Sequence, residues 1–259
     1  MQAPQNATHG GAAVFAETVA QMRARQPRVH CITNAVAQNF TANLLLAAGC
    51  VPSMTLAAEE IGTFVAGAGA LLVNLGTFDR ERREATLIAV ETAARAGVPW
   101  VLDPVFIDRS AARATFARDL VARGPAVVRL NHAEFETLSG AAPTRETLAA
   151  YARAHKVVVA LSGETDLVTD GARLVAIANG HPLMARVTAM GCAGSALVAA
   201  CLAAEADAFR AAAAGLLLVG VAGERAAAQA PGPGSFAVAV VDEIYRLDAA
   251  SLEAQAKVS

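Results

Sequence analysis

The sequence predicts an α/β protein in three layers, with a mainly parallel β-sheet between two layers of helices. Short apolar runs of strand length alternate with longer Ala-rich segments of helical pattern, which is typical of the β-α units that build a parallel sheet. Hydrophobic residues make up 55% of the 259 residues and charged residues only 17%, so a large core can cover both faces of such a sheet. We expect a single domain over residues 1–259, because neither a linker nor a repeat interrupts the pattern.

The expected strands are apolar runs bounded by turn residues. They are Val29–Thr33, Val51–Met54, Ala70–Leu75, Trp100–Leu102, Ala126–Arg129, Val157–Leu161, Leu167–Thr169 and Arg173–Ile177. Asp170-Gly171-Ala172 separates the last two, and Asp-Gly between such runs is a hairpin signal. We therefore expect an antiparallel hairpin at one end of the parallel sheet.

The expected helices are Ala-rich segments between these strands. They are Ala12–Arg25, Asn39–Ala48, Ala57–Ala66, Arg80–Ala96, Ser110–Ala122, Ala133–Ser139, Arg145–Ala154, Gly191–Ala204, Ala208–Gln229 and Phe236–Leu247. Pro231-Gly232-Pro233-Gly234 is expected to end the helix that precedes the last one. Val187–Ala204 and Ala211–Gly223 lack Asp, Glu, Lys and Arg. We interpret both as buried helices, because the first contains polar and Gly residues and the second is shorter than the ~20 residues of a membrane span.

Charge and cysteine content disfavour several classes of protein. The formal net charge is −2 and no basic run is present, so nothing favours nucleic acid. The first ten residues, MQAPQNATHG, have neither the charged nor the apolar region of a secretory signal. Cys31, Cys50, Cys192 and Cys201 lack CxxC or metal-ligand spacing, and a disulfide framework is not expected in so long a chain with so few cysteines. We expect a cytoplasmic protein with reduced thiols, and some apolar surface buried between subunits.

Polar residues follow five of the expected strands, at the edge where open α/β sheets bind ligands. They are Thr33-Asn34, Asn74, Asp103-Pro104, Arg129 with Asn131 and Glu134, and Ser162-Gly163-Glu164. Each alone is more often a turn or a helix cap, but five such strand ends favour one shared cleft. Asp103 and Glu134 have the chemistry to place Mg²⁺ through water, and Arg129 has the chemistry to bind a phosphate. A turn before a proline, a first-turn helix charge and an ion pair are the respective alternatives.

The segment Arg186–Ala196, RVTAMGCAGSA, brings small residues to the start of an expected long helix. Backbone N–H groups at such a turn form an anion hole suited to phosphoryl transfer, while a tight helix crossing is the alternative. Cys192 falls where the helix dipole is expected to lower its thiol pKa, so that it could accept a proton from a substrate hydroxyl or hydrogen-bond to it. A small buried hydrophobe is the alternative for Cys192. We interpret His30 and His181 as structural, and the lack of a Walker GxxxxGK[ST] sequence excludes a P-loop enzyme.

Several segments resemble the hydroxyethylthiazole kinases in content and order. They are VHCITNAVAQNFTANLLLAAGCVPSM, LLVNLGT, VPWVLDPV, VVRLNHAEF, ALSGETDLVTDG, NGHPLMARVTAMGC and GPGSF, between about Val29 and Leu247. The resemblance implies a ribokinase-like α/β fold and a homotrimer with sites at subunit interfaces. It also implies transfer of the γ-phosphoryl group of ATP, with Mg²⁺, to the alcohol of 4-methyl-5-(2-hydroxyethyl)thiazole, a reaction that salvages thiazole for thiamine biosynthesis.

The same resemblance implies roles for individual residues. Matches to thiazole-contacting positions are Met54, Asn34, Val36 and Ala189, and matches to ATP-contacting positions are Arg129 and Ser162. Asp103 and Glu134 match the acidic residues near magnesium. Gly191 and Cys192 match the end of the anion-hole motif and are the expected catalytic residues. Relatives in the wider superfamily carry a catalytic Asp at the position of Cys192.

Three departures from the family pattern concern the expected site. Ala189 stands where the motif has its first Gly, so its methyl group could narrow the pocket or forbid a positive φ. Leu130 replaces a Gly in the segment after Arg129, which could reshape the ATP loop. Residues 106–109, Phe-Ile-Asp-Arg, replace a Gly-rich stretch. These departures bear on substrate choice and rate more than on the fold.

Two other functions remain open at the level of sequence. One is another ribokinase-like activity, such as a hydroxymethylpyrimidine kinase or a nicotinamide-hydrate dehydratase. Those enzymes normally keep an Asp at the position of Cys192, so Cys here favours the thiazole kinase. The other is a catalytically weak nucleotide-binding protein, which the three departures motivate.

Overall fold

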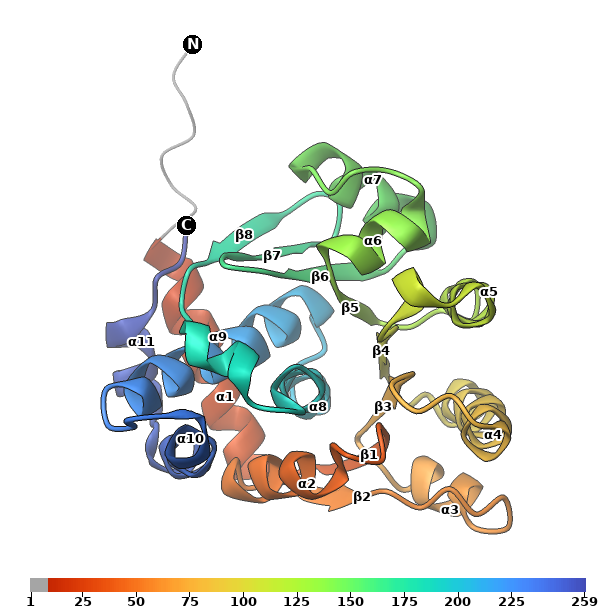
Figure 1. The fold of residues 1–259 in the computed structure, drawn as a ribbon, viewed down its shortest axis with the longest axis horizontal. Helices are drawn as coiled ribbons and strands as arrows, with labels where there is room; N and C mark the ends of the chain where they lie inside the picture. The colour runs from red at the N-terminus through yellow and green to blue at the C-terminus, as the bar shows by residue number, and fades with distance from the viewer. Residues whose placement is uncertain (1–8) are drawn as a thin grey trace.

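An eight-stranded sheet separates two layers of helices in the computed structural model, which describes residues 9–259 (Figure 1). The strands are β1 (Arg28–Ile32), β2 (Val51–Ser53), β3 (Ala70–Asn74), β4 (Trp100–Asp103), β5 (Val127–Asn131), β6 (Val158–Ser162), β7 (Asp166–Thr169) and β8 (Leu174–Ile177). They are ordered β2-β1-β3-β4-β5-β6-β7-β8. The first six are parallel and β7 is antiparallel to both of its neighbours. The predicted parallel sheet and its terminal hairpin are both confirmed.

The helices divide between the two faces of the sheet. One layer contains α1 (His9–Arg25), α2 (Gln38–Ala47), α8 (Met190–Leu202), α9 (Ala208–Ala227), α10 (Pro233–Arg246) and α11 (Ala249–Gln255). The other contains α3 (Ile61–Ala66), α4 (Arg80–Ala96), α5 (Ala111–Val121), α6 (His132–Ser139) and α7 (Arg145–His155). In Figure 1, α8 and α9 lie on one side of the central strands, and α4 and α5 lie on the other. This is the three-layer arrangement predicted from the sequence.

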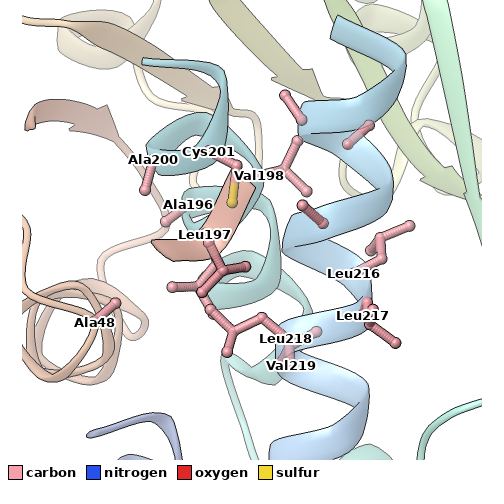
Figure 2. Packing of buried hydrophobic residues seen from close by; sticks show 14 of the residues in the cluster. Ala48, Ala196, Leu197, Val198, Ala200, Cys201, Leu216, Leu217, Leu218 and Val219 are labelled. Carbon is pink, nitrogen blue, oxygen red and sulfur yellow. The ribbon is translucent and has the colours of Figure 1, made fainter. Parts of the chain in front are cut away.

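Two hydrophobic cores follow from the alternation of side chains along the strands. In β3 every residue is buried, with Ala70 and Leu72 facing the α8–α9 layer and Leu71 and Val73 facing the α3–α7 layer. Figure 2 shows side chains of α8 and α9 filling the space between these two helices. The two charge-free stretches are therefore helices of the core, as expected. No helix within residues 9–259 is long and apolar enough to cross a membrane.

Several boundaries differ from those predicted, for local reasons. The helix expected from Ala57 begins only at Ile61, because a turn occupies residues 57–60. Pro233, expected in a break, instead opens α10, since its fixed φ and missing N–H suit the first position of a helix. The short helix α11 and the 3-10 helices Ile107–Arg109 and Pro182–Arg186 were not predicted.

The four cysteines are free thiols, as expected. His30 is fully buried, with Nδ1 2.8 Å from Ser53 Oγ and Nε2 3.1 Å from Thr55 O, and burial lowers its pKa to about 4. Neutral and saturated with hydrogen bonds, it fits the structural role expected of it. His181 accepts a hydrogen bond from Leu183 N at 3.2 Å and caps a 3-10 helix, but it also lines a cavity described below.

Candidate functional site

Two cavities lie at the carboxyl ends of β5 and β6 and share part of their walls. The larger has a volume of about 650 Å³ and the smaller of about 260 Å³. Both are lined by Arg129, Ser162, Met184, Ala185, Met190 and Gly191. The larger cavity extends toward α9, whereas the smaller reaches Asp103, Glu134 and Cys192. Ligand groups bound in the two cavities would therefore meet beside Arg129 and the start of α8.

The first turn of α8 supplies backbone donors at this junction. The first α-helical bond runs from Ala193 N to Ala189 O at 2.8 Å, so the amides of Gly191 and Cys192 precede it. A Cβ at position 191 would lie 3.0 Å from Arg129 Nη1, which explains why a glycine suits this position. The first-turn amides, the positive end of the helix dipole and a guanidinium thus converge on one place.

Arg129 is half-buried on β5 and lies between the two cavities. Its Nε is buried without a hydrogen-bond partner among residues 9–259. A buried donor without a partner is unfavourable unless a ligand satisfies it. Arg129 is therefore suited to bind an anionic group, as the strand-end position predicted.

Asp103 ends β4 and is almost completely buried. Its Oδ2 accepts hydrogen bonds from Asn74 Nδ2 and Ser195 Oγ, each at 2.7 Å. Burial raises the pKa of this carboxyl, and the nearby Arg129 partly opposes that effect. Asn74 was predicted only as a polar residue at a strand end, and Ser195 was not predicted as a site residue. Ser195 is a polar residue in the apolar helix α8, and that was the available signal.

Glu134 serves as a helix cap and also lines the smaller cavity. Its Oε2 accepts from Asn131 N at 2.9 Å, while Asn131 Oδ1 accepts from Glu134 N at 3.0 Å, which completes a capping box. Its Oε1 accepts from Phe106 N at 3.0 Å. Burial, and then the negative charge of Asp103, raise the pKa of Glu134. The first-turn helix role weighed as an alternative is real, but it coexists with a place in the cavity wall.

The acidic pair fits a hydrated magnesium ion better than a cage made only of protein ligands. Within residues 9–259 no group of three or more His, Cys, Asp and Glu side chains could hold a metal. Mg²⁺ in phosphoryl-transfer sites keeps several waters and is bound through one or two carboxylates plus substrate phosphates. Asp103 and Glu134 line one cavity, and their raised pKa values reflect buried negative charge that a cation would offset.

Cys192 does not have the low pKa expected of a thiol at a helix N-terminus. Burial, followed by the negative charge of Asp103, raises its pKa to about 12. The expectation of a lowered pKa was wrong, because it considered the helix dipole without the surroundings of the sulfur. The thiol still lines the smaller cavity beside Gly191, where it is protonated at neutral pH.

Comparisons with known proteins agree with this architecture. Residues 19–250 match the family model described as "HK: Hydroxyethylthiazole kinase family". The chain is 44% identical over 236 residues to a probable hydroxyethylthiazole kinase of Agrobacterium fabrum, covering 91% of each chain. The chain belongs to the hydroxyethylthiazole kinase family. Membership of this family makes the protein an enzyme that transfers a phosphoryl group.

Solved structures extend the comparison to the fold. A hydroxyethylthiazole kinase protein from Pyrococcus horikoshii OT3 superposes with a TM-score of 0.90 at 36% identity, covering 95% of this chain and 98% of that one. A ribokinase-like superfamily protein from Enterococcus faecalis superposes with a TM-score of 0.67 at 13% identity, covering 95% and 91%. The second likeness concerns the fold alone. The expected ribokinase-like fold is thereby confirmed.

Two departures from the hydroxyethylthiazole kinase pattern fall on left-handed backbone. Ala189 has φ +74° as the residue before α8, and Phe106 has φ +61° after β4. Both residues line the smaller cavity. Non-glycine residues adopt this conformation at a cost of roughly 1–2 kcal/mol, and such strain is typically found at functional sites. The methyl group of Ala189 therefore strains the positive φ rather than forbidding it.

The third departure lies in the core. Leu130 alternates with Arg129 and Asn131 along β5, so its side chain points to the opposite face of the sheet. It is buried in the core beneath α5, α6 and α7, and pairs in register with Leu161. Leu130 therefore continues the strand, and its side chain lines neither cavity.

Three of the expected substrate-contacting residues do not line either cavity. Asn34 follows β1, where its Oδ1 accepts from Thr77 Oγ1 at 3.1 Å and from Val36 N at 3.2 Å. Val36 is 69% exposed, and the half-buried Met54 follows edge strand β2. These residues share the carboxyl edge of the sheet with the cavities but lie toward its β2 end. Ala189, Arg129, Ser162, Asp103, Glu134, Gly191 and Cys192, in contrast, are brought together.

Proposed function

We propose that this protein transfers the γ-phosphoryl group of ATP to the hydroxyl of 4-methyl-5-(2-hydroxyethyl)thiazole, in thiazole salvage for thiamine biosynthesis. The family match over residues 19–250 supports the choice of substrate. One structural observation carries the reaction type: the two cavities meet at Arg129 and at the first turn of α8. Convergent donors of this kind stabilise the charge on a transferring phosphoryl group.

The larger cavity suits the nucleotide. Leu216 and Val219 of α9 line only the larger cavity and give it an apolar surface that can enclose an adenine ring. Arg129 and Ser162 lie at its polar end, where they are proposed to contact the phosphates of ATP. The triphosphate would then run toward the first turn of α8.

The smaller cavity suits the γ-phosphoryl group and the alcohol. Phosphoryl transfer passes through a loose transition state in which positioning and charge stabilisation matter more than base strength. In the proposal the amides of Gly191 and Cys192 bind the phosphoryl oxygens, and the Cys192 thiol orients the alcohol. Asp103 and Glu134 would hold Mg²⁺ through water. Bound Mg²⁺ supplies neutralisation of charge on the phosphate oxygens.

The remaining substrate contacts are proposed to come from a neighbouring subunit of a homotrimer. Asn34, Val36 and Met54 lie near the β2 end of the sheet, away from the two cavities of their own chain. Exposed apolar side chains at this end support burial between subunits, namely Val36, Leu46 and Val51. We place the enzyme in the cytoplasm, where its four free thiols would stay reduced.

A substrate panel tests the proposal. Purified protein is incubated with Mg-ATP and millimolar hydroxyethylthiazole, a hydroxymethylpyrimidine or pyridoxal, and the products are identified by mass. We expect the thiazole phosphate to form fastest. Phosphorylation of a pyrimidine alcohol without any thiazole phosphate would contradict the proposal.

A further inference from the structure

One wall of the larger cavity is a loop whose conformation depends on distant segments. Residues 178–181 join β8 to the 3-10 helix Pro182–Arg186, and each of them lines the cavity. The loop includes Gly180 at φ +152°, a conformation that favours glycine. Because the loop lies outside regular secondary structure, its shape must be set by contacts with other parts of the chain.

The segment 256–259 provides the first set of contacts. It runs along β8, with Ala176 N bonded to Ser259 O at 2.9 Å and Ala178 N bonded to Lys257 O at 2.9 Å. Figure 1 shows the C-terminus beside the end of β8. Lys257 N also donates to Asn179 Oδ1 at 2.7 Å, inside the loop. These bonds fix the backbone where it leaves the sheet.

Asn179 and Glu224 provide the second set. Asn179 is 5% exposed, and its Nδ2 donates to Glu224 Oε2 at 3.2 Å and to Gln255 O at 2.9 Å. Glu224 Oε1 accepts from Gly180 N at 3.0 Å and from Lys257 Nζ at 2.8 Å. A single carboxylate on α9 therefore joins two loop residues to the 256–259 segment.

The backbone of α9 presses closely against the same loop. A Cβ at Gly220 would lie 2.7 Å from Asn179 O, so only glycine permits this approach. Glu224 lies one helical turn after Gly220, on the same face of α9. The loop is thus held between α9 on one side and residues 255–259 on the other. Glu224 and Lys257 are not part of the cavity lining, so they reach a bound ligand only through the loop.

We propose that Glu224, acting with Lys257 through Asn179 and Gly180, is a positioning residue that fixes the nucleotide-facing wall of the larger cavity. The inference rests on the proposed function, in which this cavity holds ATP. Loss of the Glu224 carboxylate would leave the Gly180 amide without its acceptor and the Asn179 amide with one fewer. The wall would then be less well fixed, and ATP would bind more weakly while the chemistry at Cys192 stayed intact.

Glu224→Ala tests this, with Glu243→Ala as the matched control. Glu243 is also a carboxylate with three side-chain partners, Arg225, Gln229 and Arg246, but it lies on α10 away from both cavities. We expect Glu224→Ala to raise KM and Kd for ATP by roughly two- to thirtyfold, with kcat and the KM for the alcohol unchanged. Glu243→Ala should lower the melting temperature but leave ATP affinity at the wild-type value. Glu224→Gln, which keeps an acceptor for Gly180 N, should recover much of the affinity.

The outcomes separate this inference from the proposed function. Calorimetry on the wild-type protein comes first, and failure to bind ATP would contradict both. ATP binding by the wild type with unchanged affinity in Glu224→Ala would overturn the positioning role alone. If Glu224→Ala does not fold, Lys257→Met is measured instead, because it removes only the ion pair between the exposed Lys257 side chain and Glu224. A smaller rise in the Kd for ATP is then expected, and an unchanged Kd would overturn the inference.

Discussion

At Cys192, burial raises the pKa of the thiol more than the dipole of α8 can lower it. A dipole contributes about 0.3–1 kcal/mol at a helix end. The rise of the thiol pKa from 9.0 to about 12 corresponds to an effect on the order of 4 kcal/mol in the opposite direction. The sequence predicted that Cys192 lies at the start of a helix. It could not predict that the Asp103 carboxylate lies near the thiol, because this proximity depends on the packing of α8 against β4.

Substitution of Cys192 separates a catalytic from a packing role. Cys192→Ala should keep the fold and ATP binding but lose much of its turnover, because the group proposed to orient the alcohol is removed. Cys192→Asp should keep or raise turnover, because a carboxylate at the same place can accept the hydroxyl proton; general-base assistance contributes roughly 10²–10⁴-fold. Turnover and melting temperature are measured for both variants. A fully active Cys192→Ala beside an inactive, strongly destabilised Cys192→Asp would show that Cys192 only packs.

Ala189→Gly should stabilise the protein slightly. Relief of the left-handed strain should increase the free energy of unfolding by roughly 1–2 kcal/mol. The greater freedom of glycine in the unfolded chain should decrease it by roughly 0.5–1 kcal/mol. Ala199→Gly, inside α8, is the control and should cost about 1 kcal/mol. Urea unfolding measures both changes. Equal losses of stability in the two variants would contradict the strain assigned to Ala189.

The site residues that the sequence revealed are those that end strands. Asp103, Arg129 and Ser162 each close an apolar run, and parallel strands bring their ends to one edge. The roles of Ser195 and Glu224 were not predicted, because their hydrogen-bond partners are far away along the chain. Ser195 binds a carboxylate 92 positions away and Glu224 binds Lys257, 33 positions away. Ser195 stood out as a polar residue in an apolar segment, but no local pattern identifies so distant a partner.

At the scale of elements, strands and long helices were predictable and short or terminal ones were not. Apolar runs between turn residues located all eight strands, and Asp170-Gly171 identified the hairpin β7–β8. Helix α11 has only seven residues, too few for a clear periodic pattern. The pairing of Val258 with Ile177 depends on the direction in which the chain continues after α11, and no local pattern predicts that direction.

The crossing of α8 and α9 explains the small residues that were ambiguous in the sequence. A Cβ at Gly215 would lie 2.7 Å from Val198 Cα, whereas one at Gly194 would make an ordinary contact of 3.7 Å with Val219. Gly215→Ala should therefore destabilise the protein by about 1–3 kcal/mol through overpacking. Gly194→Ala should be neutral or stabilising by up to about 1 kcal/mol. Thermal unfolding of both variants checks this, and a tolerated Gly215→Ala would contradict the close crossing. The sequence left two interpretations of the small residues open, an anion hole and a tight helix crossing. Gly191 fits the first interpretation and Gly215 fits the second.

At the scale of the whole molecule, the exposed apolar surface predicts assembly. Large side chains exposed near α2, β2 and α10 are Val36 (69%), Leu46 (58%), Val51 (52%), Val238 (65%) and Tyr245 (72%). We expect a homotrimer that buries part of the Asn34–Met54 region. Light scattering at micromolar concentration should report a mass near three times 26.4 kDa. A monomer that phosphorylates thiazole at full rate would contradict a site shared between subunits.

In the proposed function the two cavities form one active site, and Arg129 binds the phosphates of ATP where they meet. Calorimetry of Mg-ATP binding to the wild type and to Arg129→Ala tests this proposal most directly. Ser162→Ala is measured beside them as a substitution that removes only a neutral contact. Removal of a charge-assisted contact to phosphate costs roughly 1.5–3 kcal/mol. ATP should therefore bind to Arg129→Ala at least about tenfold more weakly than to the wild type, and Ser162→Ala should lose less affinity. Equal ATP affinity in the wild type and Arg129→Ala would contradict it.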